Sequence, residues 1–328
     1  MNDAKFNFLV QADSDGQLED LCRKEVDRDW QQFNDGMYCW PLLTYLVLKQ
    51  YGLPVTCSRH CRRDSINLGH AAHLSTMKPE SDVFLVCIQA DYPRHGWAQA
   101  HIVQNKTQER RDSFWIPMWP QTGLVARNPE RCGVQCVAFA GRYYYLSGGQ
   151  SAWQTSIEEL GMSFLMLDPK NWNDYSGVDV LLAIRSLDDR NYTTKPPSKL
   201  VNAWLAGIPL VAGYDSAYSQ IGRPGLDYIR AGTKQGALEA IRRLQSDPAF
   251  YQGIVDAGRV SAREFTRSRC AEKWKQLLNG PLTDRYRAWS CRSRLDSILW
   301  MGRASWGKTV RGLRYTASRM FKRWMPFP

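Results

Sequence analysis

One segment in the second half of the chain combines two lysines with the predicted start of a helix. It is KPPSKLVNAWLAGIPLV, in which Ser198 precedes an apolar helical pattern. We expect the Ser198 side chain to cap this helix and to leave free backbone N–H groups around Lys199. A helix N-terminus carries partial positive charge, to which Lys195 and Lys199 add full charges. The segment is a candidate anion site, with Asn202 on the same face one turn on, although a capped amphipathic helix with solvated lysines has the same pattern.

Three histidines in the first third of the chain are candidates for proton transfer. His70 follows a predicted strand at 65–68, where a residue of a cleft would lie, and His95 and His101 follow with Asp91 and Arg94 nearby. Because histidine titrates close to neutral pH, each could remove a proton from a hydroxyl group. Each could equally be a hydrogen-bonded structural histidine. In the turn at 34–36, Gly36 would let backbone N–H groups approach a ligand.

Two Asp-x-Asp pairs are the candidates for a divalent metal ion. Asp13 with Asp15 and Asp27 with Asp29 both precede any complete βαβ unit. We interpret them as solvated loop charges, and we expect neither a metal ion nor a cofactor. The nine cysteines are odd in number and scattered through the chain, which favours a reducing, cytoplasmic compartment over a disulfide framework.

The elements that must position these residues are those of two α/β domains. At 328 residues and 44% hydrophobic, the chain is too long for one core of ordinary size. Apolar runs alternate with helical patterns as in a parallel sheet, and most runs are too continuously apolar to be half-exposed. Residues 105–130 change to charges and prolines, as a crossing between domains would. The predicted strands are 6–10, 53–58, 65–68, 83–89, 100–104, 134–140, 163–167, 178–184, 209–213 and 226–230; the predicted helices are 37–51, 153–160, 198–206, 234–245, 248–265 and 267–278.

The net charge of +11 is concentrated at the C-terminal end of the chain. Residues 281–328 hold eleven Lys or Arg and two Asp, against 32 basic and 30 acidic residues before them. From Trp306 to Trp324, apolar residues recur at three- and four-residue steps with basic residues opposite. This pattern favours a helix lying on an anionic membrane surface. Nucleic-acid binding is the rival interpretation, and we rank it lower because the tryptophans share the apolar stripe.

The run KPPSKLVNAWLAGIPLVAG, followed by DSAYSQIGRPGLDYI and by a helix pair ending in GR…A.EFT…W, resembles the donor domain of bacterial GT-B glycosyltransferases. The resemblance covers residues 134–278, with a hinge-like piece at FWIPMWPQTGLVARNP. It implies two Rossmann-like domains facing a cleft: an acceptor-side domain at 1–122 and a nucleotide-sugar domain at 123–280, followed by a basic tail at 281–328. The chain departs from the best-known retaining families because its helix lacks their pair of glutamates.

The resemblance also implies roles for particular residues. Gly141 and Arg142 match the glycine and arginine that brace the donor diphosphate, and Tyr218 is a candidate wall of the sugar site. The implied activity is metal-independent transfer of a sugar from a nucleotide-sugar to a glycan or lipid-linked acceptor at the cytoplasmic membrane face. Two alternatives stay open: a non-catalytic sugar-nucleotide-binding or scaffold protein, and a nucleic-acid-binding protein acting through its tail.

Overall fold

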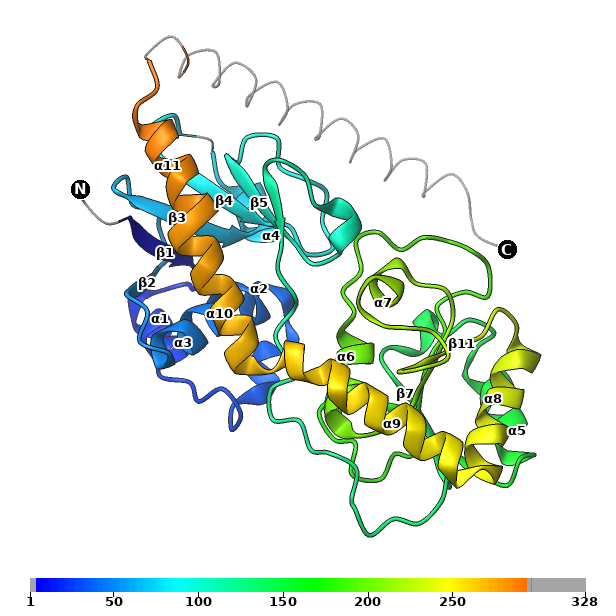
Figure 1. Ribbon diagram of the computed structural model, residues 1–328. Helices are drawn as coiled ribbons and strands as arrows, with labels where there is room; N and C mark the ends of the chain where they lie inside the picture. The colour runs from blue at the N-terminus through cyan, green and yellow to red at the C-terminus, as the bar shows by residue number, and fades with distance from the viewer. Residues whose placement is uncertain (1–3, 79, 294–295, 297–328) are drawn as a thin grey trace, which may run out of the picture.

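The computed structural model describes residues 4–78, 80–293 and 296, and these form two α/β domains (Figure 1). The first domain contains a six-stranded sheet in the order β2-β1-β3-β4-β5-β6, and the second a five-stranded sheet in the order β11-β10-β9-β7-β8. Every paired strand in both sheets is parallel to its neighbour. The predicted fold class, two Rossmann-like domains, is confirmed.

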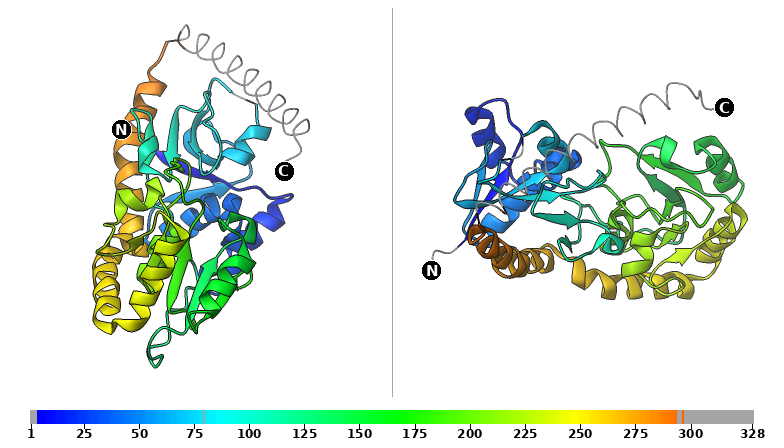
Figure 2. Two further views of the ribbon diagram at one scale, coloured as in Figure 1. Left: turned by 90° about the vertical axis from the view of Figure 1, so that its right-hand side faces the viewer. Right: turned by 90° about the horizontal axis from the view of Figure 1, so that it is seen from above.

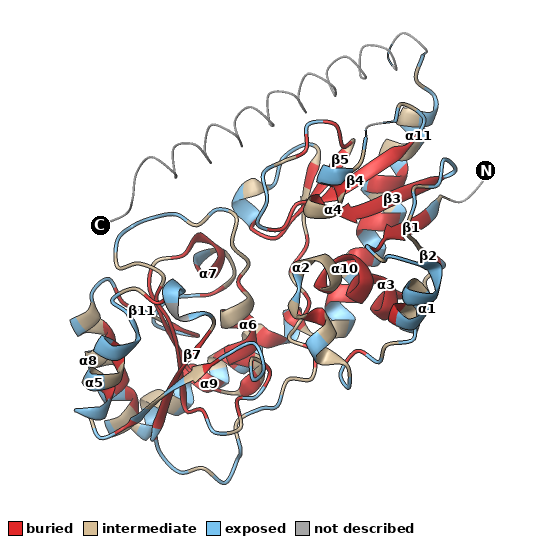
Figure 3. Ribbon diagram, turned by 180° about the vertical axis from the view of Figure 1, so that it is seen from behind, coloured by how far each residue is buried: buried red, intermediate tan, exposed pale blue. Residues whose placement is uncertain are grey.

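Three inner strands of the first domain, at 65–70, 84–88 and 100–103, are buried along their whole length (Figure 3). The predicted helix at 37–51 is two helices, because Pro41 starts the second of them and its ring nitrogen has no N–H to continue the first. The elements are β1 (Lys5–Leu9), α1 (Asp15–Cys22), η1 (Trp30–Asn34), α2 (Gly36–Cys39), α3 (Pro41–Gln50), β2 (Val55–Ser58), β3 (Ser65–His70), α4 (Ala71–Thr76), β4 (Phe84–Ile88), β5 (Ala100–Val103), η2 (Lys106–Gln108) and β6 (Ser113–Trp115).

The second domain repeats the alternation of strands and helices. The loop between β6 and β7 enters it, and its sheet is covered by helices on both faces (Figures 1 and 2). Its elements are β7 (Cys136–Ala140), η3 (Tyr143–Tyr145), α5 (Gln150–Glu158), β8 (Ser163–Leu167), β9 (Val180–Ala183), α6 (Ser198–Ala206), β10 (Leu210–Ala212), α7 (Ser216–Ile221), β11 (Ile229–Arg230), α8 (Lys234–Ser246) and α9 (Pro248–Ala262).

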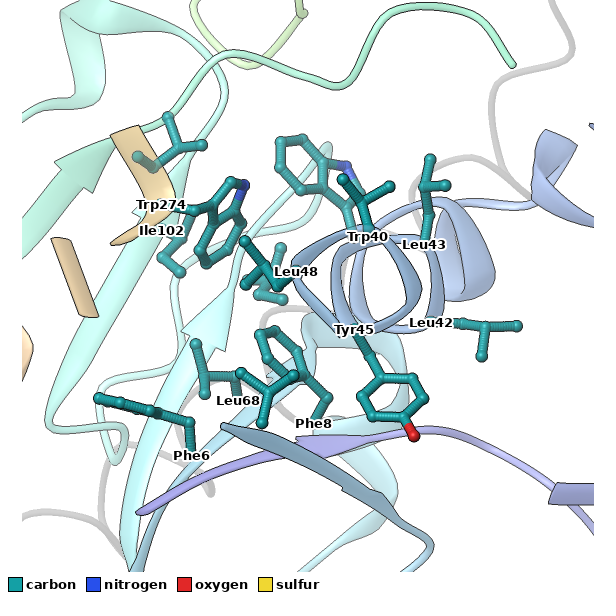
Figure 4. Packing of buried hydrophobic residues seen from close by; sticks show 14 of the residues in the cluster. Phe6, Phe8, Trp40, Leu42, Leu43, Tyr45, Leu48, Leu68, Ile102 and Trp274 are labelled. Carbon is teal, nitrogen blue, oxygen red and sulfur yellow. The ribbon is translucent and has the colours of Figure 1, made fainter. Parts of the chain in front are cut away.

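After α9 the chain returns to the first domain. A short turn, η4 (Arg263–Phe265), leads into α10 (Arg267–Leu277), and η5 (Leu278–Leu282) and α11 (Thr283–Ser290) follow along the first sheet (Figure 1). Trp274 of α10 is fully buried in the core of the first domain, with its ring edge-on to Phe8 at 6.2 Å (Figure 4). The predicted domain boundary at residue 280 therefore falls inside a helical segment that packs on the first domain.

Asp27 of the first domain holds both segments that cross between the domains, one at Gly123 and one at the start of α10. Both guanidinium Nη atoms of Arg267 bond the carboxylate of Asp27, at 2.6 and 2.9 Å. The same carboxylate accepts the backbone N–H of Gly123 at 2.9 Å. The part of the chain that is described holds no helix long and apolar enough to cross a membrane. The amphipathic stripe predicted from Trp306 to Trp324 lies outside the described residues.

Candidate functional site

A cavity of about 290 Å³ lies between the two domains. It opens where chain segments leave the carboxyl ends of strands, notably after β7 and β9, which are neighbours in the sheet although β8 comes between them in sequence. Ligands of parallel α/β domains bind at such a change of strand order. The cavity is lined from the first domain by Phe33, Asn34, Cys39, Asp91, Met118 and Gln121, and from the second by Ala140, Gly141, Arg142, Tyr145, Trp172, Tyr175, Arg185, Lys195, Pro196, Ser198, Lys199 and Asn202.

The N-terminus of α6 faces this cavity. The prediction that Ser198 caps the helix is wrong: Pro197 occupies the N-cap position and no side chain caps the helix. The carbonyl of Pro197 accepts the N–H groups of Leu200 and Val201. In the described part of the chain, the N–H groups of Ser198 and Lys199 make no hydrogen bond, so they remain available to an anion in the cavity.

Lys199 extends from this helix end to the end of β7. Its Nζ lies 4.2 Å from the centre of the Phe139 ring. Gly141 has a φ of +145°, and a Cβ at that position would lie 3.4 Å from Nζ, so the glycine leaves room for the ammonium group. Burial and, to a smaller extent, the charges of Arg185 and Lys195 lower the pKa of Lys199 to about 7, against the opposing effect of the Asp215 carboxylate.

Two of the four cations in the cavity are neutralised by carboxylates. Arg185 pairs with Asp215, and Lys195 Nζ lies 2.5 Å from Asp91 Oδ2 across the cleft. Within the described residues, Arg142 and Lys199 have no carboxylate at ion-pair distance. Arg142 is exposed, and its Nη1 donates to the Tyr144 hydroxyl at 3.0 Å. The cavity therefore presents two basic groups without carboxylate partners beside a helix N-terminus, and a bound anion would favour the charged form of Lys199.

Six of the eight predicted ligand-binding residues line this cavity, and two do not. Gly36 lies beside it at the start of α2, where a Cβ would lie 3.4 Å from His70 Nε2. Tyr218 is buried in α7 with its ring edge-on to Tyr228. The six residues in the lining are Gly141, Arg142, Lys195, Ser198, Lys199 and Asn202. Their roles in binding stay predictions.

The three predicted histidines are buried in the first domain and do not line the cavity. His95 Nε2 lies 2.7 Å from the carbonyl oxygen of Ala71, and His101 Nε2 lies 2.8 Å from that of His95. The Nδ1 of His70 accepts the N–H of Ala72, so its neutral ring carries the proton on Nε2. Burial lowers the pKa of both His70 and His101 to about 4. This geometry does not favour a histidine as the base, and that role remains a prediction.

Two charged residues of the cavity were not among the predicted site residues. Arg185 is the second residue after β9, and its guanidinium lies 5.7 Å from the centre of the Tyr192 ring. Asp91 follows β4 and was noted only as a neighbour of the histidines. A charged residue at the end of a wholly apolar run marks the carboxyl end of a buried strand, and this signal could have identified Arg185.

The Asp-x-Asp pairs lie away from the cavity. Asp15 pairs with Arg59, while Asp27 pairs with Arg267 at the start of α10. The Asp29 carboxylate accepts the backbone N–H of Glu25. Across the ranges 4–78 and 80–293, no cluster of three His, Cys, Asp or Glu side chains is arranged to hold a metal ion. All nine cysteines are free thiols.

No family model and no curated protein matches this chain. Among solved structures, that of Anabaena HepE in complex with UDP and glucose is similar with a TM-score of 0.50 at 13% identity, covering 84% of this chain and 100% of that one. TarM, which another solved structure identifies as an S. aureus protein, has a TM-score of 0.48 at 11% identity over 73% of this chain. This chain spans 58% of the length of TarM. The likeness to HepE shows that the chain has the GT-B fold, as the sequence resemblance implied.

Proposed function

We propose that this chain is a glycosyltransferase that takes a sugar from a nucleoside-diphosphate-sugar donor. The observation that carries the proposal is the pair of cations without carboxylate partners, Arg142 and Lys199, beside the free N–H groups of α6. Two positive charges and a helix N-terminus match the two negative charges of a diphosphate. The same groups would stabilise the diphosphate as it leaves with the electron pair of the broken bond to the sugar carbon.

We propose further that transfer needs no metal ion. A divalent cation in such reactions neutralises the leaving phosphates, and Arg142 and Lys199 would supply that charge from the protein. The HepE structure was solved with UDP and glucose, which makes UDP-sugars the first donors to test. The acceptor is proposed to be a glycan or a lipid-linked molecule at the cytoplasmic membrane face. The support for this location is the basic, amphipathic sequence of residues 281–328.

The test is a thermal-shift series on the full chain, in EDTA, with UDP, GDP, CDP, ADP and their hexose conjugates. A ligand that binds only the folded state raises the melting temperature. We expect a shift with one nucleotide and a loss of about ten- to a hundredfold in its affinity in Lys199→Ala, since a hydrogen bond to a charged group is worth roughly 1.5–3 kcal/mol.

The matched control is Lys275→Ala, which removes an exposed lysine of α10 outside the cavity lining. Wild-type affinity in that control would show that the loss in Lys199→Ala is local. If no nucleotide raises the melting temperature of the wild-type protein, the proposed donor site is wrong and the alternative of a scaffold protein is favoured. Binding of the nucleotide without any hydrolysis or transfer across candidate acceptors would favour the non-catalytic sugar-nucleotide-binding alternative.

A further inference from the structure

The cavity contains one carboxylate among its described lining residues, that of Asp91. It comes from the first domain, opposite the cations of the second. The hydroxyl groups of a sugar are hydrogen-bond donors, and an ionised carboxylate is an acceptor at both of its oxygens. We propose that Asp91 recognises hydroxyl groups of the sugar in the donor. This inference rests on the proposed function, because it assumes that a nucleotide-sugar occupies the cavity.

The orientation of the Asp91 carboxylate is fixed by two side chains. Gln104 Nε2 donates to Oδ1 at 2.6 Å, and Lys195 Nζ contacts Oδ2 at 2.5 Å. Gln104 is itself anchored, since the same Nε2 donates to the carbonyl oxygen of Thr194 in the second domain at 2.7 Å. Each carboxylate oxygen has about two lone-pair sites. One site on each oxygen is therefore occupied within the protein, and one is left for a ligand hydroxyl.

Asp91 is also close to the end of the cavity that would hold the phosphates. Lys195, its ion-pair partner, and Arg185 both line the cavity with Lys199. A sugar is bonded directly to the second phosphate of its donor, so a group that recognises it must lie next to the phosphate site. The Asp91 side chain is 45% exposed, which keeps it within reach of a ligand.

Because Asp91 is paired with Lys195, substitution of Asp91 should affect binding of the diphosphate and binding of the sugar differently. Without the Asp91 carboxylate, Lys195 would be free to turn toward the diphosphate. The diphosphate makes no contact with Asp91 in this proposal, so its binding would not weaken. The sugar, in contrast, would lose its acceptor. Substitution of Asp91 should therefore maintain or strengthen binding of the bare nucleotide and weaken binding of the sugar nucleotide.

The experiment compares a nucleoside diphosphate with its hexose conjugate on full-length Asp91→Asn by calorimetry. For the wild type we expect the conjugate to bind more tightly than the bare nucleotide. In the variant we expect the nucleotide to bind equally well or a few-fold better, and the conjugate to lose about tenfold, one charge-assisted hydrogen bond. For turnover of the donor, we expect KM to rise more than kcat falls.

Two further variants complete this experiment. Asp188→Asn removes an exposed carboxylate outside the cavity lining and should behave as wild type. Asp91→Glu keeps the charge but moves it by one methylene group. This variant should change the preference of the protein between hexoses that differ at one hydroxyl. If Asp91→Asn does not fold, the result with Asp91→Glu tests the role of Asp91 instead. Unchanged discrimination of conjugate from nucleotide in Asp91→Asn overturns the role of Asp91 while leaving the proposed function intact. Absence of nucleotide binding to the wild type overturns both.

Discussion

The two walls of the cavity are built from the same kind of sheet, yet their polar side chains behave differently. In the second domain, Arg142 and Lys199 reach the cavity with no carboxylate partner in the described part of the chain. In the first domain, His70 is the last residue of β3, but its Nδ1 accepts the N–H of Ala72 and its ring does not line the cavity. Proximity to a strand end thus does not make a residue functional. What distinguishes the two walls is whether local groups already satisfy the side chain.

The domains also differ in how their cores are completed. The buried residues of the two clusters in the second domain all come from Val134 to Phe265. The core of the first domain instead includes Trp274 and its neighbours on α10, from the far end of the described chain. The first domain thus depends on a segment that follows the second domain in sequence, whereas the core of the second is contiguous in sequence.

The largest expected effect comes from removing the contribution of α10 to the core of the first domain. Trp274→Ala should cost about 3–5 kcal/mol of unfolding free energy, because it empties a fully buried site against the first sheet. Denaturant unfolding of the full chain measures it. Trp274→Phe is the control: it keeps most of the ring and removes an indole N–H that is buried without a partner in the described residues, so it should cost much less. A loss below about 1 kcal/mol in the alanine variant would contradict the dependence of the first domain on α10.

Much of the fold could be predicted because buried parallel strands are continuous apolar runs. The run at 178–184 predicts β9, and the glycine after Ala206 marks the end of α6. Several elements could not be predicted in this way, and β6 and α7 show why. The strand β6 is three residues long, between a charged segment and two prolines. The helix α7 is short and polar, and its Ser216 is bonded by Asn105 of the other domain at 2.9 Å. Both depend on tertiary partners that no local pattern contains.

The candidate site was predictable only where it is local in sequence. Ser198, Lys199 and Asn202 lie in the first turns of α6 and Lys195 lies three residues before it, so their common location follows from closeness in sequence and from helix geometry. Asp91 and Lys195 are 104 residues apart, and their ion pair exists because of how the two domains are placed. The same holds for His95, whose partner, the carbonyl oxygen of Ala71, lies 24 residues away in sequence.

Substitution of Arg142 separates its contribution to nucleotide affinity from that of Lys199, the other cation without a carboxylate partner. Because Arg142 is exposed, its contact with a diphosphate is screened by water and salt. Arg142→Ala should therefore lower nucleotide affinity by only about three- to tenfold, less than Lys199→Ala. The deficit should shrink as salt is raised, as affinity measurements at two ionic strengths would reveal. An effect larger than that of Lys199→Ala would reverse the assignment of the stronger contact.

The pKa of Lys199 predicts a pH dependence for binding. With the cavity empty its pKa is about 7, and a bound diphosphate would raise it by stabilising the charged form. Affinity should be constant below pH 7 and should fall as the pH rises above 7, by at most tenfold per unit, with uptake of up to one proton. Calorimetry in buffers of different ionisation enthalpy measures that uptake. Lys199→Arg stays charged throughout, so this component should disappear; its persistence would place the titrating group elsewhere.

The smallest effect is expected from the opposite wall. His70→Gln keeps an acceptor for the Ala72 N–H and a donor near the position of Nε2, so the fold should tolerate it. Because the pKa of His70 is lowered to about 4, this ring stays neutral between pH 6 and 8 and cannot produce the titration assigned to Lys199. We expect nucleotide affinity within about twofold of wild type and an unmoved midpoint near pH 7 in the calorimetric profile. A midpoint that moves would mean that the first wall carries a titrating group after all, and the contrast between the two walls would fail.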